Sequence, residues 1–549
     1  MRFGILLMAT LAAGCASQPG RHEQVDAIFK QWDGRTTPGC AVVIARNGTA
    51  EYARGYGMAN LEHDVPITAR TVFPAASLAK QFIAFSIALL AQDGKLSFDD
   101  DIRRYVPEMP DYGRTITIDH LIHHTSGLRE QGQLLNLAGW RGADLYTEED
   151  ILRLLRRQRN LNFEPGSEIV YGNAAYTLLG IIVRRVSGRS LATFTRERIF
   201  EPLGMADTRF RDDPTAVVPR RAAAYSARDG GGWSTSVPPG TSIGLFTSAA
   251  DLLRWEQNFV DVRVGGATPI RWMQSSGRLS DGTETGYGGG VFVGDYRGLR
   301  TVRHDGFDGG YRHEAVLFPE HGLTIIALCN AATVEPTERT RRLADLYLGD
   351  RMHVPALAPA IPASNAEQSA WAGVYWSPWT DEVVRIEWKE GALRQTGNPA
   401  PFVPIGAGVF RPGDLPHEWR FVAPGAGARP DAQPELHIRD AWPTRRVFRR
   451  VVEPLPDVSA LSAYVGQYRS EETEMTYTVL VAHGLLRLTW PRQYDVALDA
   501  VGGDRFVGSR GTVTFIRDRA GEVSGLTISN RRLRRLGADR VRGAAAARE

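Results

Sequence analysis

The first two thirds of the chain alternate short apolar, strand-like runs with helices that are apolar on most faces. One helix is predicted from Ser77 until Gly94, because Phe, Ile and Leu recur in it and glycine ends the pattern. A second helix is predicted from Ala174 to Gly188. Such helices belong in a domain interior, so their first turns are held rigidly at the edge of a core. The strand-like runs are 40–45, 301–304 and 324–329. We therefore interpret residues 24–350 as one α/β domain.

A different pattern follows a Pro- and Ala-rich stretch at 351–365, which is typical of a linker. Beyond it come short alternating segments that repeat with an offset of 93 residues. The matching pairs are Gly373-Val-Tyr375-Trp-Ser377 with Gly466-Gln-Tyr468-Arg-Ser470, and Gly391-Ala-Leu393-Arg394 with Gly484-Leu-Leu486-Arg487. We predict two tandem copies of one small, closed antiparallel β-barrel, at 366–452 and 458–545.

The N-terminus has the form of an export signal. Arg2 precedes an uncharged apolar run at 3–13 that is too short to span a bilayer. The run ends in Leu11-Ala-Ala-Gly-Cys15, which resembles the lipobox of bacterial lipoproteins. Residues 1–15 are then the signal peptide, Cys15 the lipidated first residue of the mature chain, and 16–23 a tether. The alternative is an ordinary secretory signal cleaved nearby.

Export would place the protein in the periplasm. No acidic sorting residue follows Cys15, so the resemblance to bacterial lipoproteins favours an outer-membrane anchor if the host has such a membrane. The rest of the composition fits a protein that folds in water: 43% apolar and 23% charged residues exclude wholesale disorder and a polytopic membrane protein. A formal charge of +3 over 549 residues offers no electrostatic argument for binding nucleic acid.

Lysine is rare in this chain, and one lysine lies beside a candidate nucleophile. The only lysines are Lys30, Lys80, Lys95 and Lys389. Lys80 lies three residues after Ser77, so on a helix both side chains emerge from the same face. A serine hydroxyl needs a neighbouring base, and burial or the positive end of the helix lowers the pKa of a lysine enough for it to serve. The alternative is an N-cap serine with an exposed lysine.

Two further motifs supply complementary groups. Tyr171-x-Asn173 offers a phenol that can shuttle protons and an amide that can orient Lys80 or a substrate carbonyl. His304-x-Gly306 offers a donor at a strand end, followed by a residue without a side chain, so that a substrate backbone could lie against the strand. Taken alone, these residues are more often a core aromatic, a helix cap and an exposed histidine.

Together, in this order, the three motifs resemble those of the penicillin-recognising serine hydrolases, which include class C β-lactamases, D,D-carboxypeptidases, D-aminopeptidases and related esterases. Further segments look like the framework of that superfamily: Leu121–Leu128, Phe163–Gly166, Glu201–Met205 and Gly244–Asp251. The resemblance implies a central antiparallel sheet flanked by helices, with a second, helical lobe across the active-site cleft. It implies no metal and no organic cofactor.

The resemblance also assigns roles. Ser77 would be the acylated nucleophile, with Lys80 and Tyr171 sharing the role of base. Four residues would bind substrate: Asn173, His304, Gly306 and Phe307. The backbone N–H of Phe307 would complete an oxyanion hole with that of Ser77.

The sequence departs from the β-lactamase pattern at His304, where those enzymes usually carry lysine. A histidine with its ordinary pKa of about 6.5 is mostly neutral at pH 7, which weakens the case for carboxylate-bearing β-lactams. With two β modules, the chain looks more like three-domain D-aminopeptidases, in which a barrel loop shapes the pocket. We expect an exported serine hydrolase that cleaves a small amide or ester, such as a D-amino-acid peptide. The alternatives are a β-lactamase or D,D-carboxypeptidase, and a penicillin-binding receptor that acylates without turnover.

Two other patterns are rejected, and one is left open. Gly240-Thr-Ser242-Ile-Gly244 matches a nucleophile elbow, but prolines precede it where an apolar strand is required. The histidines His120, His123 and His124 lack the spacing of a metal site. Cys40 and Cys329 lie in apolar strands and are expected to be two buried thiols. In the superfamily those strands resemble antiparallel neighbours, so a disulfide is the alternative.

Overall fold

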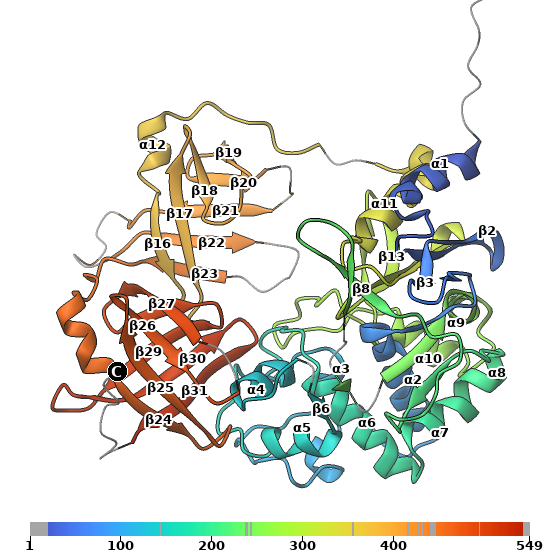
Figure 1. Cartoon of the computed structure of the whole chain (residues 1–549), viewed down its shortest axis with the longest axis horizontal. Helices are drawn as coiled ribbons and strands as arrows, with labels where there is room; N and C mark the ends of the chain where they lie inside the picture. The colour runs from blue at the N-terminus through green and yellow to red at the C-terminus, as the bar shows by residue number, and fades with distance from the viewer. Residues whose placement is uncertain are drawn as a thin grey trace, which may run out of the picture.

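The computed structural model places a mixed α/β domain beside two eight-stranded β units (Figure 1). It describes residues 20–541, apart from 143, 237–239, 242–243, 354–355, 414, 416, 426–428, 430–431, 440–445 and 493–494. The predicted signal peptide and Cys15 lie outside these residues. Within them, no helix is long and apolar enough to cross a membrane.

The α/β domain is built on a six-stranded antiparallel sheet with the order β12-β13-β14-β15-β1-β2. The strands are β1 (Cys40–Arg46), β2 (Thr49–Tyr56), β12 (Phe292–Tyr296), β13 (Leu299–Asp308), β14 (Tyr311–Phe318) and β15 (Leu323–Cys329). β1 and β15 are continuous apolar runs because both faces of the sheet are covered. Val42 lies in the core cluster that β1 shares with α1 (Arg21–Phe29) and α11 (Pro336–Leu348) on one face of the sheet. Val43 lies in the cluster on the other face, which includes α9 (Ala249–Asp261). α1 begins within the segment predicted as a tether.

The two predicted apolar helices are both present. A single 3₁₀ turn, η2 (Ala76–Leu78), leads into α2 (Ala79–Gln92), and α6 (Ala174–Ser187) packs against it. Gly188, with φ of 70°, ends α6 as its left-handed cap. The domain also contains the helices α3 (Ile118–Ile122), α4 (Gln131–Leu137), α5 (Glu148–Leu155) and α7 (Leu191–Thr195). With α6 they form a helical lobe beside the sheet.

The C-terminal region contains the repeated β units. The second is a closed eight-stranded barrel of β24–β31. The first is an eight-stranded sheet whose end strands meet at an isolated bridge between Arg394 and Pro401, so it is barrel-like rather than closed by a full ladder. The first unit has the strands β16 (Gly373–Trp376), β17 (Val383–Lys389), β18 (Ala392–Gln395), β19 (Phe402–Gly406), β20 (Val409–Pro412), β21 (Glu418–Val422), β22 (Glu435–Arg439) and β23 (Arg446–Arg450). The second has β24 (Gly466–Ser470), β25 (Met475–Ala482), β26 (Leu485–Thr489), β27 (Asp495–Gly502), β28 (Arg505–Gly508), β29 (Gly511–Arg517), β30 (Val523–Asn530) and β31 (Leu533–Arg540).

The sequence repeat has a structural counterpart in the first strand of each unit. In β16, the Tyr375 hydroxyl donates to the carbonyl of Trp371 at 2.9 Å. In β24, the Tyr468 hydroxyl donates to the carbonyl of Tyr464 at 2.7 Å. The two tyrosines are 93 residues apart, so the predicted register of the repeat matches the structure.

The closed barrel docks on the helical lobe through buried polar contacts. Arg129, fully buried, pairs with Glu472 of the barrel and donates to the carbonyl of Arg534 at 3.0 Å. The Tyr477 hydroxyl donates to the carbonyl of Leu137, at the end of α4, at 2.9 Å. Figure 1 shows β30 and β31 facing α4. The barrel and the lobe therefore share one continuous core.

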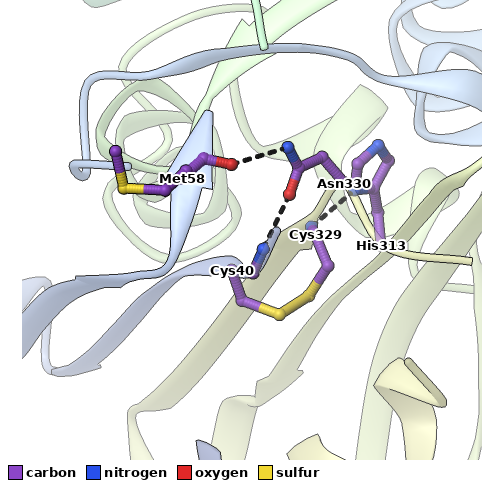
Figure 2. The surroundings of a disulfide bond; sticks show 6 residues. Cys40, Met58, His313, Cys329 and Asn330 are labelled. Atoms are coloured by element: carbon purple, nitrogen blue, oxygen red, sulfur yellow. Dashed lines mark hydrogen bonds between the residues drawn. A yellow bond between two sulfur atoms is a disulfide. The ribbon is translucent and has the colours of Figure 1, made fainter. Parts of the chain in front are cut away.

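Cys40 and Cys329 form a disulfide, which corrects the expectation of two free thiols (Figure 2). They are direct cross-strand partners in the β1–β15 ladder, and both are fully buried. Asn330 secures the same end of the ladder, since its side chain accepts from the Gly39 N–H at 2.8 Å and donates to the carbonyl of Met58 at 3.0 Å. The bond links residues 289 positions apart.

Chain lacking residues 1–15 is expected to have no titratable thiol when denatured without reductant, and two after reduction. Two thiols before reduction would refute the bond. The Cys40→Ala/Cys329→Ala variant is expected to lose roughly 2–5 kcal/mol of unfolding free energy, because the closed loop is long. Denaturation of the reduced wild type provides the control.

Candidate active site

Ser77 lies on a tightly packed turn between strand and helix. β5 (Val72–Pro74) pairs with β11 (Gly244–Ser248), and the Ala75 N–H donates to the carbonyl of Leu245 at 2.7 Å. Ala76 then adopts a φ of 50°, which is unusual for a residue with a side chain. The strained turn presents Ser77 at the start of the buried helix.

This turn needs a glycine at position 306. A Cβ atom on Gly306 would lie 2.7 Å from the carbonyl oxygen of Ala75. β13 therefore packs directly against the backbone that precedes Ser77. The missing side chain makes room for the Ala75 carbonyl, whereas the sequence interpretation assigned that room to a substrate backbone.

The side chain of Lys80 contacts residues of two motifs, Ser77 and Asn173. Its Nζ is 3.0 Å from Ser77 Oγ and donates to Asn173 Oδ1 at 2.7 Å. It also lies 4.8 Å from the centre of the Tyr171 ring. Burial lowers the pKa of Lys80 to about 7, an effect partly opposed by the charge of Glu130. A lysine in this state loses its proton near neutral pH.

Tyr171 lies close to both Ser77 and Lys80. Burial raises the pKa of its phenol, while a hydrogen bond with Ser77 lowers it. The ring is packed against His124, with 4.4 Å between ring centres. His124 Nδ1 accepts from the Gly172 N–H at 3.4 Å, so it also holds the backbone of the Tyr171–Asn173 turn.

Glu130 fixes the orientation of the Asn173 amide. Asn173 Nδ2 donates to Glu130 Oε1 at 2.9 Å, which directs Oδ1 toward Lys80. The other carboxylate oxygen accepts from the Gln133 N–H at 3.0 Å and caps α4. Glu130 was not singled out in the sequence. It belongs to no local motif, and its position shortly after the 121–128 framework segment is the only signal.

His304 is not at a strand end and does not line the cleft. It lies within the continuous strand β13 and is only 1% exposed. Its Nδ1 donates to the carbonyl of Asp305 at 2.6 Å, and its Nε2 is 3.1 Å from the Tyr287 hydroxyl. Burial, together with the charge of Lys80, lowers its pKa to about 3. His304 is thus a buried, neutral residue near Tyr171, and its side chain does not line the cleft; that it positions substrate stays a prediction.

A cleft of about 820 Å³ opens at Ser77. Phe307, 47% exposed, lines it from the sheet side. Its apolar lining includes Ile83 of α2 and, from the helical lobe, Leu135, Trp140, Ile151 and Leu191. Arg532, from the turn between β30 and β31 of the closed barrel, also lines it. The site is therefore formed by three parts of the chain: the sheet, the helical lobe and the barrel.

The patterns rejected in the sequence have other surroundings. Ser242 lies outside the described residues, and the element that follows it is the strand β11, whereas a nucleophile elbow requires a helix. His120 Nδ1 accepts from the Thr117 N–H in the cap of α3. His123 Nδ1 lies 3.1 Å from Asp119 Oδ1. Among the described residues, no three His, Cys, Asp or Glu side chains gather as a metal site.

Comparison with known proteins agrees with this geometry. The family model described as beta-lactamase matches residues 25–349, more than half of the chain. The chain belongs to the beta-lactamase family. Within that family it is 25% identical over 456 residues to D-aminopeptidase of Gluconobacter oxydans, covering 82% of this chain and 83% of the relative. It is 28% identical over 357 residues to penicillin-binding protein 4* of Bacillus subtilis, covering 61% and 77%.

The fold extends over nearly the whole length of one solved structure. The octameric penicillin-binding protein homologue from Pyrococcus abyssi superposes with a TM-score of 0.54 at 19% identity, covering 86% of this chain and 98% of that one. This likeness concerns the fold alone. Together with the relatives above, the family makes the protein a serine hydrolase of the beta-lactamase fold.

Proposed function

We propose that the protein hydrolyses a small amide or ester of a D-amino acid through an acyl-enzyme on Ser77. The observation that carries the proposal is the buried Lys80, whose Nζ lies 3.0 Å from Ser77 Oγ and whose pKa burial lowers to about 7. A lysine of that pKa is a general base at neutral pH. Similarity to a D-aminopeptidase supports the D-amino-acid substrate.

The chemistry proceeds in two halves. Neutral Lys80 takes the proton of Ser77 while Oγ attacks the scissile carbonyl, and the backbone N–H groups of Ser77 and Phe307 stabilise the oxyanion. The scissile C–N or C–O bond then breaks, and Tyr171 passes a proton to the leaving group. Protonated Lys80 then returns its proton to Tyr171, which restores both groups. In the second half, water attacks the acyl carbonyl and gives a proton to Lys80, and this proton passes to Ser77 Oγ as its bond to the acyl carbon breaks. Asn173, held by Glu130, keeps Lys80 in place.

Export as a lipoprotein on Cys15 is part of the proposal. The buried Cys40–Cys329 disulfide supports it, because such bonds persist in oxidising compartments outside the cytosol. Labelling with a radioactive fatty acid tests it, and loss of the label in Cys15→Ser is the expected result. Equal label in both chains would contradict the anchor.

A four-substrate panel separates the candidate activities. Chain lacking residues 1–15 is assayed on a D-alanine anilide, a short nitrophenyl ester, a chromogenic cephalosporin and a D-Ala-D-Ala peptide. The proposal predicts steady turnover of the D-alanine substrate above the cephalosporin. Preference for the cephalosporin would favour a β-lactamase. A single burst without turnover would favour a penicillin-binding receptor.

The pH profile follows from the pKa of Lys80. Because only the neutral amine accepts the serine proton, kcat/KM for an uncharged ester should rise with pH and level off above about 7. Below that value it should fall about tenfold per pH unit. His304, with a pKa of about 3, stays neutral throughout this range and contributes no step. A profile that is flat between pH 5.5 and pH 8 would contradict Lys80 as the base.

A further inference from the structure

One cation in the cleft comes from outside the family domain. Arg532 belongs to the turn between β30 and β31 of the closed barrel. Its backbone is firmly attached to the helical lobe, because its carbonyl accepts from the Glu130 N–H at 3.1 Å and from Asn162 Nδ2 at 3.0 Å. Its own N–H donates to Asn530 Oδ1 at 3.0 Å. The turn is thus held rigidly against the active site.

The side chain of Arg532 reaches the catalytic groups. Its guanidinium carbon lies 5.6 Å from the centre of the Tyr171 ring. Its charge is also felt at Lys80, where it lowers the pKa of the amine. Arg532 is therefore beside the residue that we assign to proton transfer with the leaving group.

The guanidinium of Arg532 is available to a ligand. The side chain is exposed and, in the part of the chain that the structure describes, it has no ion pair and no side-chain hydrogen bond. Other arginines of the same hairpin are used structurally: Arg534 pairs with Glu168 at 2.8 Å, and Arg535 with Asp381 at 3.5 Å. Of these three hairpin arginines, only Arg532 lines the cleft, which also has Arg141, Arg211 and Arg221 from the α/β domain in its lining.

Two acids near the site, Glu130 and Asp305, are already engaged, and Asp308 also lines the cleft. Glu130 accepts from Asn173 and from the Gln133 N–H, and Asp305 lies 3.7 Å from Arg303. Neither therefore neutralises the guanidinium. A planar fork of donors beside a proton relay is suited to a carboxylate on the departing half of the substrate.

We propose that Arg532 binds a carboxylate on the leaving group, so that the preferred substrate is a short peptide with a free C-terminus rather than a simple amide. This inference rests on the proposed function and names its substrate class. It gives the barrel a direct role in specificity. It also assigns carboxylate recognition to a residue of the barrel, since the buried, neutral His304 cannot supply a charge.

A matched pair of substrates tests the inference. kcat/KM is measured for D-alanyl-D-alanine and for its C-terminal amide in the wild type, Arg532→Gln and Arg535→Gln. We expect the wild type to prefer the free acid by roughly 10- to 100-fold, and Arg532→Gln to lose that preference. Arg535→Gln removes the same charge from the same hairpin outside the cleft and should keep the wild-type ratio. A ratio cancels any change in the basicity of Lys80.

The outcomes separate this inference from the proposed function. If the wild type cleaves neither D-substrate, the proposed function fails. If it cleaves both and Arg532→Gln leaves their ratio unchanged, only the role of Arg532 is overturned. A ratio that falls in Arg211→Gln instead would move carboxylate recognition to another cleft arginine. Arg532→Lys, which keeps the charge without the fork, should retain part of the preference.

Discussion

Ser77→Ala and Lys80→Arg should each lower kcat by at least roughly 1,000-fold. The serine variant lacks the nucleophile. The arginine variant keeps a positive charge of similar reach, but a guanidinium does not release its proton at accessible pH and cannot accept one from Ser77. The two losses should be similar, because nucleophile and base act as one unit.

Lys95→Arg is the matched control for this prediction. Lys95 is exposed just beyond the end of α2, so the same substitution there should leave kcat unchanged. Steady-state rates with a nitrophenyl ester and far-UV circular dichroism separate a chemical defect from misfolding. More than a tenth of the wild-type rate in Lys80→Arg would refute the assignment of the base.

Glu472→Gln should destabilise the chain by about 3–5 kcal/mol. Glu472 is the barrel partner of Arg129, whose side chain is completely buried between the barrel and the helical lobe. The substitution leaves the guanidinium buried without its counter-charge, and the remaining hydrogen bonds to barrel carbonyls do not replace it. The cost is large because desolvation of a charge is not offset when its partner is removed.

Glu474→Gln is the control that separates the effect of breaking a buried ion pair from the effect of losing one negative charge. Glu474 pairs with Arg157 two residues along the same segment, but both of those side chains are partly exposed. Its removal should cost no more than about 1 kcal/mol. Urea denaturation followed by tryptophan fluorescence compares the two variants. Equal shifts would show that the Arg129–Glu472 pair contributes no more than an exposed ion pair.

The pairing of Ser77 with Lys80 could be predicted from the sequence. Ser77 and Lys80 are three residues apart on one helix, so their proximity depends only on helix geometry. The two β units could also be predicted, because the sequence repeat places Tyr375 and Tyr468 at equivalent positions of the two units.

Contacts between segments that are far apart in the chain could not be predicted from the sequence. Glu130 acts on Asn173 across 43 positions, and Arg532 reaches Tyr171 only because the barrel docks on the helical lobe. The disulfide depended on the register between β1 and β15, where Cys40 lies directly opposite Cys329. One residue of slippage would have moved the two side chains to opposite faces.

The surroundings of His304 and Gly306 differ from those expected from the sequence, because a motif does not reveal what its residues face. The sequence suggested a strand end at His304, whereas β13 continues to Asp308 and buries the imidazole. Gly306 fits a close approach of backbone, but the backbone is that of Ala75. Gly306 thus packs against the turn before Ser77, and His304 packs near Tyr171.

The most direct test of the central claim is peptide mass spectrometry of protein quenched in acid during turnover of a nitrophenyl ester. The account predicts an acyl group on the peptide that contains Ser77, and no adduct in Ser77→Ala. An acyl group on another residue, Ser242 included, or full hydrolysis by Ser77→Ala, would contradict it.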